Sequence, residues 1–575
     1  MAPASVNRKW IAAVSVAFLL AVAGFAVFYT TDVSYADARK DGSGYNFIVI
    51  LTDDQHAATL RGMPIVQKRL VPRSVVFDEA LVTIPECCPF RASFLSGGYY
   101  PSSTGVKTNS PLNGGMKHFN DKRTLATLLQ KMGYRTGFVS KYMHGYHPGY
   151  VPPGWTFFVA NNEGGMLRDW LNLEDITLGS RTDVVQKVGI VPKVTQYVTH
   201  LQRDQALEFI KLFHEKPFFL ILSLYAPHVP STPAPGDVGP VADIWLDIPI
   251  ERDLSDKPLW LRNYARSAGE SSRRSDVVAK RRAEKMELQL RALRPVDEAV
   301  GQILDRLEEY DILDKTVVVF ASDNGVVVDE HLAPPDKGMP YESALRVPLV
   351  VAMPGIEPHT DDHLVAVNLD VPATILDLAG IEGVGEGLSL VPLLQGHEAP
   401  WREDILIENY GYLSWRDLSP TVLWSGLRSA RWKYVEHQTG EVEFYDLEAD
   451  PYELESLHND PEYRDLLGRL ALRLEQKKGL AITTLEPPEA VIDEPYAFRL
   501  AAWGGVPPYA WTIVRGKLPD GLSFDKANQL IAGTPRKIEE TKVTFRVSDS
   551  KPASHSGEVQ EFSWPMKFVV RDSGS

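Results

Sequence analysis

The sequence predicts an α/β protein with a mainly parallel sheet covered by helices, followed by a smaller α+β subdomain and an all-β sandwich. Three observations lead to this prediction. Short apolar runs alternate with amphipathic stretches up to about residue 400, aromatic-rich runs follow in 401–485, and short alternating strands occupy 487–572. Strands that alternate with helices form parallel sheets. The chain has 575 residues, 44% hydrophobic and 23% charged, a globular composition that excludes disorder for most of it.

Five apolar runs predict the buried strands of the first domain, residues 45–400. They cover residues 46–51, 136–139, 218–224, 317–321 and 347–352. Two stretches between them, 124–132 and 292–310, carry apolar residues at helical spacing and predict covering helices. Ligands of such sheets bind beyond the carboxyl ends of the strands, so we expect the functional site there.

Two smaller units are predicted after residue 400. In the α+β subdomain, 401–485, the runs 425–435 and 441–445 predict antiparallel strands, and 463–477 predicts a closing helix. In residues 487–572 no helical pattern is found. The runs 542–547 and 561–570 there alternate like strands of a β-sandwich.

The N-terminal segment, residues 1–38, predicts export. Arg8 and Lys9 precede an apolar run from Trp10 to Tyr29, and Ala36-Asp37-Ala38 follows it. A basic start, an apolar middle and an A-x-A site are typical of a secretory signal peptide. The run is also just long enough to span a bilayer, so an uncleaved membrane anchor is the alternative. Either way, the protein body is predicted to be secreted or extracytoplasmic.

Charge and cysteine content exclude several classes of protein. The 60 basic and 75 acidic side chains give a net charge of −15, which argues against a nucleic-acid binder because phosphate contacts need a basic face. The two cysteines, Cys87 and Cys88, are adjacent, so a disulfide-stapled scaffold and a cysteine-rich zinc module are excluded. A basic run is interpreted as a solvated helical face, with a polyanion-binding patch as the alternative: Arg273, Arg274, Lys280, Arg281 and Arg282.

Oxygen-bearing side chains follow two of the predicted strands. Asp53-Asp54 comes directly after the first strand, and Ser322-Asp323-Asn324-Gly325 closes the strand 317–321. Each pattern alone also fits an ordinary strand-to-loop turn. Together they place four oxygen donors at one sheet edge, and oxygen ligands suit a hard divalent cation. The sequence therefore predicts a metal site at this edge.

A cysteine motif lies between these two segments. Cys87-x-Pro89-x-Arg91 leads into a small-residue helix start. Two interpretations follow. A free buried thiol is inert, whereas a modified one is a candidate nucleophile, because a helix N-terminus favours negative charge.

These motifs together resemble the type I sulfatases of the alkaline-phosphatase-like superfamily. The matching text runs in the same order over roughly residues 45–475: IVILTDDQ at 48–55, ECCPFRASFLSG at 86–97, SKYMHGY at 140–146, APHVP at 226–230, ASDNG at 321–325, DKGMPYESALRVPLV at 336–350 and EFYDLEADPYEL at 443–454. The double cysteine and the Lys-Tyr pair most resemble the glucosamine-6-sulfatase branch. The segment PDGLSFDKANQLIAGTP, 519–535, resembles immunoglobulin-like modules of bacterial surface proteins.

The resemblance implies a role for each matched residue. A separate maturation enzyme would oxidise Cys87 to formylglycine (3-oxoalanine), whose hydrate attacks sulfur, while Cys88 fills a variable position. Calcium is the implied cation, with magnesium as the alternative. Its implied ligands are Asp53, Asp54, Asp323, Asn324 and the modified Cys87. Arg91 would hold the aldehyde oxygens, Lys141 and Lys337 would clamp the sulfate, and His228 would protonate the leaving alcohol.

Two departures from the family pattern stand out. Many sulfatases carry a histidine two residues after the first lysine, where this chain has Met143; His144 and His147 are nearby candidates for its role. The histidine that often follows the Asp-Asn-Gly turn is replaced by Val327, and His331 comes later. We therefore expect a pocket beyond the sulfate that differs from the usual one.

The resemblance implies a sulfated small molecule or glycan as substrate, with 6-sulfated N-acetylglucosamine as the single best choice. Two alternatives stay open. One is a phosphonate or phosphate ester hydrolase with the same fold and nucleophile, and the other is a non-catalytic surface protein that binds glycans. Contact with a cell surface or a glycan is assigned to the β-sandwich.

Overall fold

The computed structural model describes most of the chain after residue 43. The described residues are 44–111, 114–147, 149–160, 173–181, 186–194, 197–237, 239–242, 249, 251, 253–267, 269, 274–333, 337–411, 423–478, 480–482, 487–503, 508–552 and 559–572. The elements below belong to the compact unit Asn46–Ser575. The predicted signal segment, 1–38, lies outside the described residues. Among the helices that are described, none is both long and apolar enough to cross a membrane.

A ten-stranded mixed sheet forms the centre of the first domain. Its order is β11-β2-β10-β9-β1-β8-β4-β5-β6-β7, and its middle strands β9, β1, β8, β4 and β5 are all parallel. The bounds are β1 Asn46–Asp53, β2 Ser74–Phe77, β4 Arg135–Ser140, β5 Phe157–Ala160, β6 Leu173–Arg181, β7 Gln186–Val194, β8 Phe218–Pro227, β9 Thr316–Ser322, β10 Leu349–Ala352 and β11 His359–Asp361. The five predicted strands are present, and the α/β class is confirmed.

The central strands are buried on both faces, which explains their continuous apolar runs. Ile48 and Ile50 of β1 join the core cluster that includes Phe209 and Val300, on helices α6 (Val198–Phe213) and α8 (Ser275–Glu309). Leu51 of β1 instead faces α3 (Cys87–Leu95) on the other side of the sheet. The remaining helices of this domain include α5 (Leu125–Lys131), α7 (Leu259–Ser267), α9 (Glu342–Leu345) and α10 (Val367–Leu378).

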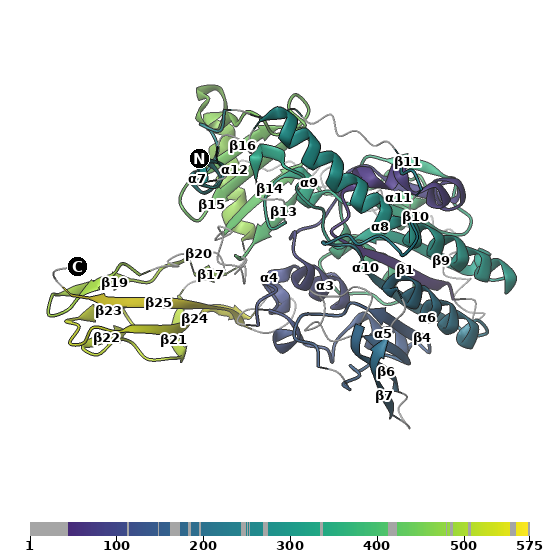
Figure 1. Ribbon diagram of the computed structural model, residues 1–575, viewed down its shortest axis with the longest axis horizontal. Helices are drawn as coiled ribbons and strands as arrows, with labels where there is room; N and C mark the ends of the chain where they lie inside the picture. Colours follow the sequence, from purple (N-terminus) through teal and green to yellow (C-terminus); the bar gives the residue numbers. More distant parts are fainter. Residues whose placement is uncertain are drawn as a thin grey trace, which may run out of the picture. The chain divides into compact units, whose positions relative to one another are not determined.

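Helix α8 is much longer than the predicted 292–310. It spans 35 residues and contains Pro295, and it is the long helix beside β9 and β10 in Figure 1. Its first half buries a sparse stripe that includes Val278, Met286 and the polar Arg282, so the pattern there is weak. The interpretation of the basic run as a solvated face is wrong for Arg282, whose guanidinium is buried and donates to the carbonyls of Val328 and Asp329, each at 3.1 Å.

A four-stranded antiparallel sheet follows residue 400. Its strands are β13 (Asp404–Asn409), β14 (Trp424–Ser429), β15 (Trp432–His437) and β16 (Val442–Asp446), and helix α12 (Arg464–Lys477) packs against it. The predicted single strand 425–435 is therefore wrong, because the chain reverses between Ser429 and Trp432. The Ser429 hydroxyl accepts a hydrogen bond from the Trp432 N–H at 2.9 Å and holds this turn, which lacks the usual glycine or proline.

The described C-terminal residues contain strands and turns but no helix, which confirms the predicted all-β unit. One sheet has the order β18-β25-β24-β21 and another β19-β23-β22, and β20 (Ala502–Trp503) pairs with β17 (Ala481–Ile482) in a two-stranded sheet. The bounds are β18 Ala490–Val491, β19 Tyr496–Arg499, β21 Ala510–Arg515, β22 Leu522–Asp525, β23 Leu530–Gly533, β24 Glu540–Pro552 and β25 Val559–Arg571. The apolar cluster of these strands also includes Ile84, Tyr410 and Leu423 from outside the sandwich.

Candidate active site

The two predicted pairs of oxygen-bearing residues meet at one edge of the main sheet. Strands β1 and β9 are parallel neighbours, with Thr52 opposite Ser322, so both pairs leave the sheet at the same level. The Asp323 N–H donates to the Thr52 carbonyl at 3.0 Å. Asp54 has a left-handed backbone, φ 58°, which turns the chain sharply after Asp53. Asp53 and Asp323 are fully buried.

Cys87 lies at the first position of helix α3, directly beside these carboxylates. Its Sγ is 3.4 Å from Asp53 Oδ1, 3.3 Å from Lys141 Nζ and 2.8 Å from Lys337 Nζ. Lys141 also forms an ion pair with Asp53, and Lys337 forms one with Asp54. Three of the predicted site residues, Cys87, Lys141 and Lys337, therefore converge on one point although they are far apart in the chain.

Burial and charge set the protonation of this cluster. Burial alone would raise the pKa of Asp53, but Lys141 and the other nearby cations hold this pKa well below its usual range. Burial, followed by the charge of Asp53, raises the pKa of the Cys87 thiol. An unmodified Cys87 is therefore a neutral thiol, which is a poor nucleophile.

Arg91 links Asp323 to the backbone of Lys141 by hydrogen bonds. It donates to Asp323 Oδ2 from Nε at 3.1 Å and from Nη2 at 2.8 Å, and Nη1 donates to the Lys141 carbonyl at 2.6 Å. Nη1 also bonds the Ser223 hydroxyl, which in turn donates to the same Lys141 carbonyl at 2.7 Å. These bonds place Arg91 under Asp323 and Lys141, whereas the resemblance implies contact with the oxygens on residue 87. Ser223 was not among the residues predicted from the sequence.

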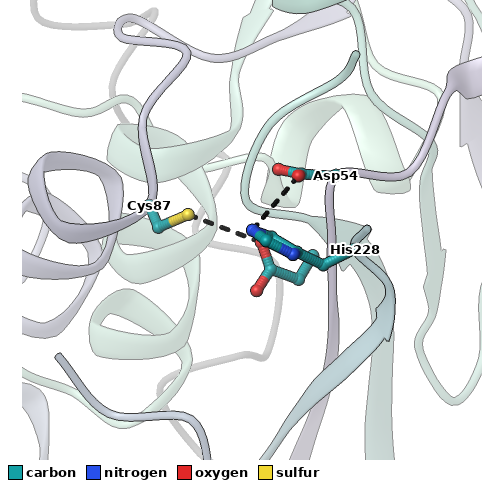
Figure 2. Close-up of side chains that lie close together, drawn as sticks. Asp54, Cys87 and His228 are labelled. Carbon is teal, nitrogen blue, oxygen red and sulfur yellow. Dashed lines mark hydrogen bonds and ion pairs between the residues drawn. The ribbon is translucent and has the colours of Figure 1, made fainter. Parts of the chain in front are cut away.

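His228 lies on the exposed side of the cluster. Figure 2 shows Asp54, Cys87 and His228 projecting toward one another. His228 Nε2 is 3.4 Å from Asp54 Oδ2, and its side chain is 18% exposed, whereas Asp54 is 6% exposed. Nδ1 lies 2.7 Å from the Val229 carbonyl oxygen. Because a carbonyl only accepts, Nδ1 donates this bond and carries a proton, and Nε2 is the ring nitrogen that faces Asp54.

The carboxylate and amide oxygens of this cluster fit a hard divalent cation. Asp53, Asp54, Cys87 and His228 each offer a ligand atom, and these atoms lie within 4.8 Å of one another. Asn324 donates from Nδ2 to Asp54 Oδ1 at 2.6 Å. Its Oδ1 is buried and has no hydrogen-bond partner among the described residues. A buried amide oxygen without a donor, next to two carboxylates, is the environment that a cation completes.

The candidates for the missing histidine lie in different places. His144 packs near the cluster: its N–H donates to Cys88 Sγ at 3.2 Å, and burial, with help from Lys141 and Lys337, lowers the pKa of its imidazole to about 3. His147 is exposed. His331 is buried elsewhere, bonded to Glu251 and packed against Tyr341 with tilted rings whose centroids are 4.1 Å apart.

Asn109 is a second residue of the site that was not predicted from the sequence. Its Oδ1 accepts the N–H of Cys88 at 2.8 Å, and its own N–H donates to Glu86 Oε2 at 3.1 Å. The first bond holds the backbone after Cys87, and the second ties the side chain of Glu86, the residue before Cys87, to Asn109. No local pattern marks such a residue, because the contact depends on how a distant loop folds back.

Models of known families match three parts of the chain between residues 45 and 564. A family model described as Sulfatase matches residues 45–381, which is more than half of the chain. A model described as N-sulphoglucosamine sulphohydrolase, C-terminal, matches residues 331–479, and an Ig domain model matches residues 480–564.

The curated relatives carry sulfatase names. The N-acetylglucosamine-6-sulfatase of Capra hircus is 29% identical over 516 residues, covering 80% of this chain and 88% of the relative. The human protein of the same name is 29% identical over 507 residues, covering 79% and 88%. An extracellular sulfatase Sulf-1 homolog of Caenorhabditis elegans is 28% identical over 67% of this chain, which spans only 56% of that relative.

Solved structures share the fold. A protein in complex with its substrate D-glucosamine-2-N,6-O-disulfate has a TM-score of 0.60 and 23% identity, covering 76% of this chain and 97% of that one. A phosphonate monoester hydrolase from Silicibacter pomeroyi has a TM-score of 0.58 and 19% identity, covering 75% and 95%. At these identities the likeness concerns the fold alone.

Proposed function

This chain belongs to the sulfatase family, and from that premise we propose that it is an exported enzyme that hydrolyses the sulfate ester of a sulfated glucosamine. The observation that carries the proposal is the convergence on Cys87 Sγ of Asp53, Lys141 and Lys337, all within 3.4 Å. A nucleophile position next to carboxylates and two ammonium groups suits a substrate whose charge develops on oxygen in the transition state.

The proposed nucleophile is formylglycine at position 87, produced by a separate maturation enzyme. Once hydrated, this aldehyde supplies one hydroxyl group to attack sulfur and a second to expel sulfate. Asp53, whose Oδ1 lies 3.4 Å from Cys87 Sγ, is the carboxylate next to this position. Asn109 and Glu86 keep the backbone of residue 87 in register.

The proposed cation is calcium, with magnesium as the alternative. Its proposed ligands are Asp53, Asp54, Asp323, Asn324 and the modified residue 87. A cation there would offset negative charge on the sulfate oxygens. Lys141 and Lys337 supply two further positive charges on the same side, and both are preorganised because Asp53 and Asp54 hold their ammonium groups in place.

His228 is the proposed general acid, which leads to a test that depends on the leaving group. We expect His228→Ala to lower kcat by about 100-fold to 10,000-fold on a sugar sulfate, whose alkoxide needs a proton to depart. The same variant should lose much less on 4-nitrophenyl sulfate, because nitrophenolate leaves without protonation. Steady-state kinetics with both substrates measure the difference.

His214→Ala is the matched control for this experiment, because His214 stacks on Tyr310 away from the site, with ring centroids 3.9 Å apart. It should leave both rates unchanged. Equal losses of His228→Ala on the two substrates would remove His228 from the role of acid and assign it to binding.

The proposed substrate is a 6-O-sulfated N-acetylglucosamine unit. Support comes from the names of the goat and human relatives and from the glucosamine disulfate in the similar structure. We expect sulfate release from this sugar to exceed that from 2-O-sulfated uronates and steroid sulfates at least tenfold, a difference of about 1.4 kcal/mol in transition-state stabilisation. Ion chromatography of released sulfate gives the readout.

The same assay decides between the proposal and its alternatives. Faster hydrolysis of 4-nitrophenyl phenylphosphonate than of 4-nitrophenyl sulfate would make the protein a phosphonate hydrolase. The second alternative would hold if protein that carries the aldehyde at residue 87 bound a sulfated glycan without hydrolysing it. The chain would then be a glycan-binding protein. Secretion is proposed from the N-terminal segment 1–38, and contact with a cell surface or glycan from the β-sandwich.

A further inference from the structure

The peptide group of Gly338, next to Lys337, is held from two sides. Its N–H donates to the carbonyl of Pro85 at 3.1 Å, two residues before Cys87. Its carbonyl oxygen accepts two side-chain hydrogen bonds, one from Asn409 Nδ2 at 2.9 Å and one from Trp424 Nε1 at 2.8 Å. Because a carbonyl oxygen has two lone pairs, these donors saturate it. The backbone next to Lys337 is therefore held by residues that are distant from it in the sequence.

The two donors are neighbours on the antiparallel sheet. Asn409 ends β13, Trp424 begins β14, and the two residues face each other in register. Asn409 is fully buried and Trp424 is 2% exposed. Side chains on paired strands are located more precisely than side chains on loops. The sheet that follows residue 400 therefore presents a rigid pair of hydrogen-bond donors to residues 337–340, here called the active-site loop.

A third contact from the same sheet holds the next residues of the loop. Lys433 on β15 donates from Nζ to the Pro340 carbonyl at 2.9 Å. Between these contacts Gly338 adopts φ 81°, a conformation that residues with a side chain rarely adopt. Residues on β13, β14 and β15 thus hold the backbone at Gly338 and Pro340, and the Lys337 Nζ lies 2.8 Å from Cys87 Sγ.

We infer that Asn409 and Trp424 are positioning residues that set where the Lys337 ammonium meets the sulfate group, an inference that rests on the proposed sulfatase function. They act through Gly338, and their own hydrogen bonds end at its carbonyl oxygen. Displacing a catalytic group by even 1 Å is costly in rate. By this inference the smaller subdomain, 401–485, helps to position a residue of the sulfate-binding site.

Trp424→Phe tests the inference with the smallest change, because it keeps an apolar ring and removes one donor. Asn409→Ala removes the other donor. A matched control is Trp401→Phe, since Trp401 Nε1 also donates to a backbone carbonyl, that of Leu364, at 2.8 Å. We expect each site variant to lower kcat/KM for 4-nitrophenyl sulfate by about fivefold to tenfold, the loss typical of one hydrogen bond.

Inhibition by inorganic sulfate provides a second readout that a merely structural role would not move. We expect its inhibition constant to rise by about the same factor in Trp424→Phe and Asn409→Ala, and to stay within about twofold of the wild type in Trp401→Phe. Thermal midpoints of all variants show whether stability has changed equally. Unchanged kinetics in both site variants, with a stability loss like that of the control, would overturn the inference.

Calorimetric titration with inorganic sulfate separates this inference from the proposed function. If the wild type hydrolyses no sulfate ester, the proposed function fails, yet the anion still reports on Lys337. Weaker sulfate binding by Trp424→Phe than by Trp401→Phe would then support the positioning role. Equal binding by the two variants would contradict it.

Discussion

Cys87→Ala should abolish hydrolysis, whereas Cys88→Ala should keep a measurable part of it. The two cysteines are adjacent, yet only Cys87 has Pro89 two residues later and Arg91 four residues later. Only Cys87 Sγ touches the carboxylate of Asp53 and both lysines. Cys88 Sγ instead accepts the His144 N–H at 3.2 Å. Loss of Cys88 should therefore loosen the site without removing the nucleophile.

Peptide mass spectrometry across residues 87 and 88 tests the assignment directly. We expect an aldehyde at 87 and a thiol at 88 in active enzyme. Cys88→Ser is the matched control, because its hydroxyl can still accept the His144 N–H, and it should recover most of what Cys88→Ala loses. An unmodified thiol at 87 in fully active enzyme would overturn the mechanism, and an aldehyde at 88 would overturn the assignment.

Asp323→Asn should remove bound cation and activity together. The change keeps the size of the side chain and deletes one negative charge from a site that already contains Arg91, Lys141 and Lys337. We expect kcat to fall by about 1000-fold, a loss comparable to that of a preorganised charge-stabilising group. Elemental analysis of the purified protein measures the cation, and chelation followed by added calcium or magnesium identifies which ion restores the wild type.

The result for Asp323→Asn has two readings, because Asp323 also binds Arg91. Its Oδ2 accepts two hydrogen bonds from Arg91. Full cation occupancy in an inactive Asp323→Asn would therefore limit Asp323 to holding Arg91. Asp297→Asn is the control: this buried carboxylate accepts the backbone N–H groups of Ile65 and Val66 at 2.9 and 2.8 Å, so its loss should lower stability and leave the cation in place.

Local sequence was sufficient wherever one segment carries the whole signal. The run 46–51 predicts β1 because a strand covered on both faces must be apolar throughout. The pairs Asp53-Asp54 and Asp323-Asn324 could be placed at one edge because parallel neighbours end at the same edge. The cysteine motif could be placed at a helix start, which the structure finds at Cys87. By contrast, the first half of α8 has few regularly spaced apolar residues. Neither the full 35-residue length of this helix nor the burial of Arg282 could therefore be predicted.

By itself, then, the sequence determined the fold class and the position of two oxygen-bearing pairs at one sheet edge, because each strand and the pair that ends it are close together in the chain. The nucleophile and the cation proposed there rest on the family resemblance. Only the tertiary structure showed which groups hold them in place. Asn409 and Trp424 are 71 and 86 residues from Gly338, and Arg91 is 232 residues from Asp323. Such bonds form because separate sheets and loops pack together. The hydrophobic pattern of a segment predicts its secondary structure, but it does not predict which distant residue its side chains will contact.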